Sequence, residues 1–202
     1  MVLIVRILHG VASLNENDAT WNPLNRWNVR NIAIASIVAA LNAALLGVFA
    51  PISYGPLQFR VSLIIQPALV ILFAYPAASG LILSGFLMNY FFGYGLTDAI
   101  VGSSLGVLEW VIMIELVKKL GRHDWLFQVS CALFSLLTGA WIGEYLAWIA
   151  GVPWEITFVS VTASTLIAFN LFGYTFFKAI TASSAIKKEV PTLKSEKKEL
   201  KD

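Results

Sequence analysis

Ionisable and amide side chains inside otherwise apolar stretches are the residues of this sequence best suited to bind a ligand. Glu109 lies near the middle of one apolar stretch, and Glu144 lies near the end of another. Charged groups are costly in an apolar environment, so they usually face a cavity or the interior of a helix bundle. The amides of Asn42, Gln66 and Asn89 can each donate and accept hydrogen bonds. They suit either a ligand or a neighbouring helix, and both interpretations stay open.

Aromatic residues accompany Glu144 on one helical face. Trp141, Glu144, Tyr145 and Trp148 are spaced at i, i+3, i+4 and i+7, which places them together on one side of an α-helix. A carboxylate between two indoles suits a flat, nitrogen-rich ligand, because the rings stack and the carboxylate accepts hydrogen bonds from N–H groups. The alternative is that the rings belong to an aromatic belt at a membrane surface, which explains the rings but not the carboxylate.

The sequence lacks the motifs that common enzymes and ATP-driven motors need. No G-x-x-x-x-G-K-[ST] loop is present, and Gly93-Tyr94-Gly95 lacks the third glycine of a dinucleotide fingerprint. Both histidines, His9 and His123, lie outside the apolar stretches, and the one cysteine cannot form an internal disulfide or a metal cluster. We therefore expect a protein that binds or moves a molecule, that is not an enzyme, and that uses no metal or cofactor.

The composition shows which elements must position these side chains. Hydrophobic residues make up 58% of the 202 residues and charged residues only 13%, whereas about a quarter of a soluble domain is charged. A chain with so little charge cannot cover a globule of this size with a soluble surface. The lengths of the apolar runs favour helices over a barrel, so we expect an all-α integral membrane protein. This excludes a cytosolic enzyme and a nucleic-acid-binding protein.

Six apolar segments follow one another, and we expect each to cross the membrane. They are 32–49, 59–74, 77–93, 97–117, 126–149 and 156–178. A straight crossing needs about 20 residues, so the second and third segments are short, and Pro67 and Pro76 interrupt them. Such helices are tolerated where they line a cavity or pack against neighbours. The pattern predicts a six-transmembrane-helix bundle with either a pocket or a kinked structural helix in this region.

The basic residues predict the orientation of the bundle. With six crossings, every one of the 14 lysines and arginines except Arg60 falls on the side that holds both termini. Basic residues concentrate on the cytoplasmic side of membrane proteins, so we expect both termini in the cytoplasm. The chain then divides into a cytoplasmic or interfacial N-terminal segment (1–31), a membrane domain (32–180) and a charged cytoplasmic tail (181–202).

Small residues recur every four positions along the first apolar segment. Ala35, Ala39, Ala43 and Gly47 form a ridge that lets another helix approach closely. The helix that packs on this ridge belongs either to the same chain or to a separate subunit that docks there.

We expect the ligand pocket in the outer half of the bundle, where depth and helical spacing gather stacking and hydrogen-bonding side chains. The predicted site residues are Tyr54, Arg60, Gln66, Asn89, Glu144 and Trp148. Arg60 is the one basic residue on the outer side, where its forked guanidinium can clamp the loop to an acidic partner. The candidates for that partner are Asp98, Glu109 and Glu144. The amides supply the donors and acceptors that the edge of a purine-like base requires.

The loop after the first segment resembles the signature of the QueT family. It reads Ala50-Pro51-Ile52-Ser53-Tyr54-Gly55-Pro56-Leu57-Gln58-Phe59-Arg60-Val61-Ser62. The likeness continues through Tyr75-Pro76-Ala77-Ala78 and Gly95-Leu96-Thr97-Asp98-Ala99, and it extends over residues 31–180. The family usually follows Arg-Val-Ser with Glu-Ala-Leu, where this chain has Leu63-Ile64-Ile65. The last span of the family usually carries a Gly-Glu pair, where this chain has Ser164-Thr165.

The resemblance implies a function and a set of partners. Members of the family are substrate-binding S components of energy-coupling-factor (ECF) transporters, assigned to queuosine precursors, which are 7-deazaguanines. The resemblance therefore implies a plasma-membrane protein whose outward-opening pocket is covered by the loop after the first segment. It implies a transmembrane coupling protein and two ATPase subunits as partners, and it implies that the ridge of Ala35, Ala39 and Ala43 docks on the coupling protein. The alternative function is a stand-alone membrane carrier or scaffold without ATPase partners.

Overall fold

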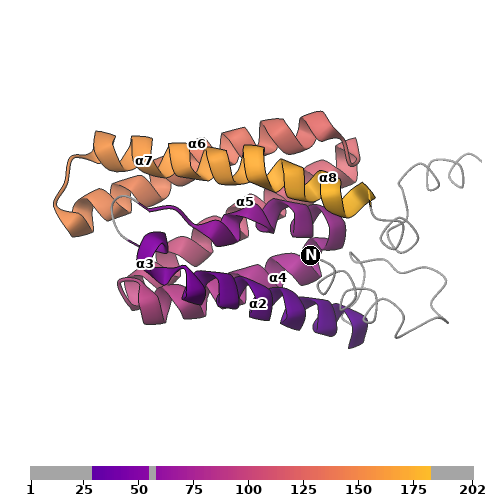
Figure 1. The fold of residues 1–202 in the computed structure, drawn as a ribbon, viewed down its shortest axis with the longest axis horizontal. Coiled ribbons are helices and arrows are strands. Elements are labelled where there is room, and N and C mark those ends of the chain that lie inside the picture. Colours follow the sequence, from indigo (N-terminus) through magenta and orange to yellow (C-terminus); the bar gives the residue numbers. More distant parts are fainter. Residues whose placement is uncertain (1–28, 55–57, 183–202) are drawn as a thin grey trace, which may run out of the picture.

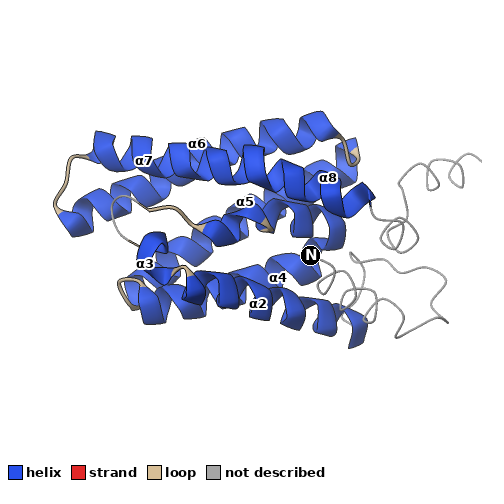
Figure 2. Cartoon of the chain, viewed as in Figure 1, coloured by secondary structure: helices blue, strands red, loops and turns tan. Residues whose placement is uncertain are grey.

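The computed structural model describes residues 29–54 and 58–182, and every regular element within these ranges is a helix (Figure 1, Figure 2). The elements are α2 (Val29–Val48), α3 (Ala50–Ser53), the 3₁₀ helix η2 (Val61–Ile64), α4 (Gln66–Phe92), α5 (Leu96–Leu120), α6 (Asp124–Ala150), α7 (Trp154–Leu166), the π-helix η3 (Ile167–Gly173) and α8 (Tyr174–Ala182). Most of the predicted N-terminal segment (1–31) and of the predicted tail (181–202) lies outside the described residues.

Five helical stretches in the described part of the chain are long and apolar enough to cross a membrane. They are Val29–Val48, Gln66–Phe92, Leu96–Leu120, Asp124–Ala150 and Trp154–Ala182. Large apolar side chains cover the outside of the bundle, and Leu83, Val159 and Leu171 are each more than half exposed. An apolar surface of this extent fits lipid rather than water. The protein is therefore a multi-pass membrane protein.

Helix α4 is not one straight rod, because the chain folds back on itself at Ala74. Gln66 Nε2 donates a hydrogen bond to Asn42 Oδ1 at 3.0 Å, and Asn42 Nδ2 donates to Ser84 Oγ at 2.8 Å. One amide of α2 thus reaches both Gln66 and Ser84, which a straight α-helix would hold about 27 Å apart. Ala74 has φ 45° and ψ −126°, and Pro76 follows it inside the helix. Proline lacks the N–H that would continue the hydrogen-bond ladder, which favours a break here.

The fold-back divides α4 into a buried first arm and a longer second arm. Residues 67–74 of the first arm are all buried, which explains why this stretch is apolar without a polar face. The predicted crossing 59–74 is α-helical only from Gln66 onward, because it starts with extended residues and η2. The second arm packs closely on α2, where a side chain at Gly80 would collide with the carbonyl of Ala35.

The remaining helices are joined by tight turns that contain glycine. Gly121, between α5 and α6, has φ 82°, and Gly151, between α6 and α7, has φ 64°. Both angles lie in the left-handed region that glycine adopts without a steric penalty. Figure 1 shows the start of α2, the α5–α6 turn and the end of α8 at one end of the bundle, and α3 and the α6–α7 turn at the other.

Candidate functional site

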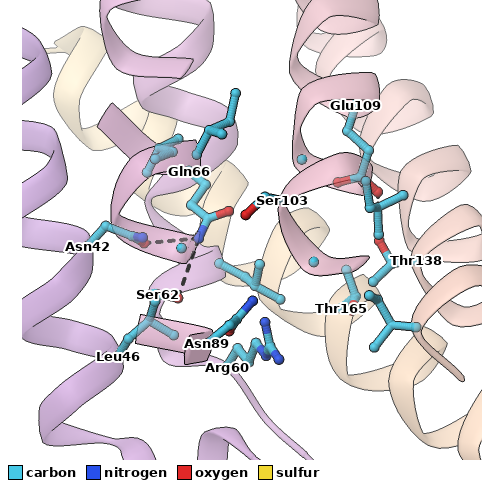
Figure 3. Close-up of a pocket in the computed structure, with 18 of the residues that line it drawn as sticks. Asn42, Leu46, Arg60, Ser62, Gln66, Asn89, Ser103, Glu109, Thr138 and Thr165 are labelled. Atoms are coloured by element: carbon cyan, nitrogen blue, oxygen red, sulfur yellow. Dashed lines mark hydrogen bonds between the residues drawn. The ribbon is translucent and has the colours of Figure 1, made fainter. Parts of the chain in front are cut away.

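A polar cavity of about 90 Å³ lies inside the bundle, between α2, both arms of α4, α5, α6 and the α7–η3 helix. Its polar lining residues are Asn42, Gln58, Arg60, Ser62, Gln66, Asn89, Ser103, Glu109, Thr138, Ser164 and Thr165. Figure 3 shows Asn42, Ser62 and Gln66 on one side of the cavity and Glu109 and Thr138 on the opposite side. The fold-back at Ala74 brings Gln66 and Asn89 to one cavity although they come from different arms of α4.

The amide side of the cavity is held by hydrogen bonds but keeps free polar atoms. Gln66 Nε2 donates to Asn42 Oδ1 at 3.0 Å and to Ser62 Oγ at 3.4 Å, while Gln66 Oε1 receives no hydrogen bond from any described residue. Asn89 Oδ1 accepts a hydrogen bond from the Tyr54 hydroxyl at 3.3 Å, and within the described ranges Asn89 Nδ2 has no acceptor. The site therefore offers one amide acceptor and one amide donor to a ligand.

Arg60 fixes the loop next to the cavity. Its Nε donates to the carbonyl oxygen of Ser53 at 3.2 Å and to Gln58 Oε1 at 3.0 Å, and the guanidinium lies 5.2 Å from the centre of the Tyr54 ring. Burial raises the pKa of the Tyr54 phenol, although the Arg60 charge opposes the shift. The phenol therefore stays protonated and keeps donating to Asn89.

The acidic partner expected for Arg60 is not a direct ion pair in this structure. Among the described carboxylates, none forms an ion pair with Arg60. Of the three candidates, Asp98 acts on Arg60 electrostatically. Arg60 therefore forms hydrogen bonds within its own loop, to Ser53 and Gln58, and not with a carboxylate.

Glu109 reaches the cavity from the middle of α5 and is 4% exposed. Thr138 Oγ1 on α6 donates a hydrogen bond to Glu109 Oε1 at 2.7 Å. Gly102 and Gly106 share the face of α5 that carries Glu109, and a side chain at Gly102 would collide with the amide of Asn89. Two glycines and a carboxylate at this spacing indicate a helix face that lines a cavity. The predicted site residues did not include Glu109, although this signal is visible in the sequence.

The structure does not bring Glu144 and Trp148 to the cavity. Trp148 is 77% exposed, and Glu144 is exposed as well. Helix α6 packs against α7 through Gly139 and Gly143, where added side chains would meet Thr162 and Phe158. This packing turns Glu144 and Trp148 to the outside of the bundle, the position that an aromatic belt at the membrane surface requires.

The small-residue ridge of α2 takes part in packing inside the chain. Ala35 and Ala39 lie against Gly80, whose absent side chain permits the close approach, and Ala43 is half-buried. The neighbouring stripe of Ala40 and Ala44 is exposed instead. At Ala35 and Ala39, the helix that packs on the ridge therefore belongs to the same chain.

A bundle of apolar helices around a polar cavity defines a class, that of multi-pass membrane proteins with a small pocket inside the helix bundle. The family comparison gives the particular family: the model described as "QueT transporter" matches residues 32–182. The chain belongs to the QueT transporter family, and it is a transporter of a small molecule rather than an enzyme. No curated protein and no solved structure matches the chain.

Proposed function

We propose that the chain is the substrate-binding S component of an ECF-type uptake transporter in the plasma membrane. Its substrate is a queuosine precursor, a 7-deazaguanine or a related heteroaromatic base. The family supports the transport function, and the lack of a P-loop in the sequence fits a subunit that relies on separate ATPases. The partners are then a transmembrane coupling protein and two ATPase subunits.

The chain makes six passes in this proposal. The fold-back at Ala74 adds one pass to the five long helices, because each arm of α4 runs along the bundle in the opposite direction. The end of the bundle that holds the start of α2 and the end of α8 also holds the last turn of α5, with Lys119, and the α5–α6 turn, with Arg122 (Figure 1). Basic residues favour the cytoplasmic side, so we place both termini there.

The observation that carries the substrate proposal is the pair of free amide atoms at Gln66 and Asn89. Gln66 Oε1 and Asn89 Nδ2 face a cavity and have no hydrogen-bond partner among the described residues. The edge of a guanine-like base presents donors and acceptors together, so it can satisfy both atoms at once. Tyr54 holds the Asn89 amide through its hydrogen bond, and Arg60 holds the adjacent loop through Ser53 and Gln58.

The site residues of this proposal are Tyr54, Arg60, Gln66 and Asn89. Glu144 and Trp148 are left out because both lie on the outside of the bundle. For docking on the coupling protein we propose the exposed stripe of Ala40 and Ala44, beside the ridge of Ala35, Ala39 and Ala43.

Mass spectrometry of small molecules that co-purify with the protein tests this proposal. We expect the wild-type protein, purified in mild detergent, to carry a 7-deazaguanine or a related base. The variant for comparison is the Gln66→Leu/Asn89→Leu double variant, which should purify as a folded protein, with a lower melting temperature because the Asn42 and Tyr54 side chains lose their partners, and without the base. A wild-type protein that carries no such base when it is made in cells supplied with 7-deazaguanine would contradict the proposal, as would a base that the double variant retains.

A further inference from the structure

The last membrane helix of the described chain contains a π-helix, η3, between α7 and α8, and the three elements form one continuous helix (Figure 1). The N–H of Ile167 bonds to the carbonyl of Ala163, four residues earlier, as in an α-helix. The N–H of Tyr174 bonds to the carbonyl of Phe169, five residues earlier. Turns of this kind are rare and occur frequently at functional sites. The π-helix η3 therefore accommodates one residue more than an α-helix along the same path.

The burial pattern shows how η3 changes the inward face of this helix. At 3.6 residues per turn, the face that buries Thr165 would return at Phe172 and Phe176. The structure instead buries Gly173 and Phe177, and Phe172 is 47% exposed. We call this arrangement the π register. In the alternative, the α register, the same residues form a continuous α-helix, and α8 is turned by about 100° about its axis.

Contacts on two sides hold η3 in the π register. Asn170 Nδ2 donates hydrogen bonds to the carbonyl oxygen of Gln128 on α6 at 2.7 Å and to Gln128 Oε1 at 2.6 Å, and Gln128 Nε2 donates to the carbonyl oxygen of Asn170 at 3.3 Å. On the other side, Gly173 lies against η2, where an added side chain would come within 3.1 Å of the carbonyl oxygen of Ile64. So close a contact excludes a bulky residue from this position.

The α register keeps the aromatic packing of α8 but requires η2 to move. It would place Phe176 where Phe177 now stacks on Phe127 with ring centres 5.1 Å apart, so an aromatic contact would be kept. It would also place Phe172 where Gly173 now lies, and a phenyl ring fits there only if η2 moves away. The position of η2 therefore decides which register η3 can adopt.

The 3₁₀ helix η2 is also part of the cavity wall. Its residues Ser62 and Leu63 line the cavity, and Ser62 Oγ accepts a hydrogen bond from Gln66 at 3.4 Å. A ligand bound to Gln66 therefore restrains η2. We propose that η3 is a moving part of the transport cycle: an occupied cavity holds η3 in the π register, and an empty cavity lets it reach the α register. The inference rests on the proposed function, because the ligand acts through Gln66.

A change of register would also alter the end of the bundle that we place in the cytoplasm. There, the Tyr174 hydroxyl donates a hydrogen bond to Asp124 Oδ2 at 3.0 Å, and Lys178 Nζ donates to the same oxygen at 2.8 Å. Turning α8 by about 100° breaks both contacts. Exposed ion pairs of this kind contribute little to stability, so they do not lock the π register. The charged surface at this end thereby depends on whether the cavity is occupied.

Deletion of Leu171 tests the proposal, because it removes the extra residue from η3. Leu171 is 60% exposed, and without it a continuous α-helix buries Gly173 and Phe177 as now, so α8 has no second register to adopt. The matched control is Leu171→Ala, which shortens the same side chain and keeps the number of residues. The readout is hydrogen–deuterium exchange of the backbone amides of η3 and α8 in the purified full chain, with and without 7-deazaguanine.

We expect 7-deazaguanine to slow this exchange at least about fivefold in the wild-type protein and in Leu171→Ala. In the deletion variant, the exchange should be slow without the base and unchanged by it, and the base should bind at least as tightly as to the wild-type protein, because the binding-competent register is the only one left. Uptake of the base by cells should fall at least about tenfold in the deletion variant and stay normal in Leu171→Ala, because only the deletion prevents the conformational step.

Three results would overturn the inference and leave the proposed function standing. They are wild-type exchange that is the same with and without the bound base, a deletion variant that keeps the ligand-dependent change, and a deletion variant that takes up the base like the wild-type protein. If the deletion variant does not fold, the exchange of the wild-type protein alone decides. Absence of 7-deazaguanine binding to the wild-type protein would overturn the proposed function, and the inference with it.

Discussion

The Tyr54 hydroxyl donates a hydrogen bond to Asn89 Oδ1 at 3.3 Å, joining the loop after α2 to the second arm of α4. Arg60 lies over the Tyr54 ring at 5.2 Å, so the same loop supplies both a donor and a cation next to the cavity. The contact fixes which atom of the Asn89 amide remains free. It thereby links the conformation of the loop to the hydrogen-bonding character of the site.

Tyr54→Phe removes this link and should weaken binding of 7-deazaguanine by about five- to tenfold, because one hydrogen bond contributes about 1 kcal/mol. The dissociation rate should rise more than the association rate falls. The measurement is equilibrium and stopped-flow binding to the purified protein. Tyr90→Phe, which changes an exposed tyrosine outside the cavity, is the control; equal effects of the two substitutions would argue against a specific role for Tyr54.

Arg60→Ala should weaken substrate binding at least about tenfold, since it removes two hydrogen bonds that close the loop. Arg60→Lys should restore binding only in part, because lysine lacks the forked geometry of a guanidinium. Calorimetric titration of both variants checks this. Wild-type affinity in the alanine variant would show that the loop holds its position without Arg60.

Ala40→Trp should leave substrate binding intact in the isolated subunit and abolish assembly with the proposed coupling protein. Ala40 is exposed on α2, so a bulky side chain there contacts lipid in the isolated subunit and obstructs only a partner helix that docks on this stripe. Pull-down of the coupling protein and ATPases by the tagged subunit is the readout. Normal assembly of Ala40→Trp would rule out this stripe as a docking surface.

Ala39→Trp provides the contrast on the other side of α2. Its backbone lies against Gly80, so a tryptophan there should force α2 and α4 apart and lower the melting temperature. Overpacking of this kind costs about 1–3 kcal/mol. A thermal unfolding curve in detergent measures the effect, and an unchanged melting temperature would contradict the close packing of the two helices.

Glu144→Gln should change substrate affinity by less than about twofold, within the range usual for exposed substitutions. The aromatic pattern around Glu144 predicts the opposite, a large loss of binding. A titration of this variant therefore decides between the helical spacing in the sequence and the orientation of α6 in the structure. A loss of binding comparable to that of Arg60→Ala would show that Glu144 contributes to the binding site.

Helix positions were predictable from the sequence, whereas helix faces were not. The predicted segment 97–117 lies within α5, and 126–149 lies within α6, because apolar length alone identifies such helices. Lipid is as apolar as a protein core, so the sequence of an apolar helix does not indicate which of its sides faces the interior of the bundle. That is why spacing alone placed Glu144 toward a ligand, and why it could not separate the Ala39 side of α2 from the Ala40 side.

The cavity was predictable only in part for a related reason. Gln66 and Asn89 stood out as amides in apolar segments, and the prolines marked an irregular region between them. No local sequence pattern predicts that Ala74 adopts φ 45°. This backbone conformation creates the fold-back that brings the two amides together. Long-range geometry of this kind depends on how the arms of α4 pack on α2 and cannot be obtained from local periodicity.

The most direct test of the central claim compares two ligands that differ only in the groups read by the amide pair. 7-Deazaguanine carries the oxo and amino groups of the guanine edge, and 7-deazapurine lacks both. A site built to hydrogen-bond these groups leaves its own polar atoms unpaired with the second ligand, so calorimetry should show a preference for 7-deazaguanine of at least about a hundredfold. Equal affinity for the two ligands would contradict the claim that Gln66 and Asn89 recognise the edge of a base.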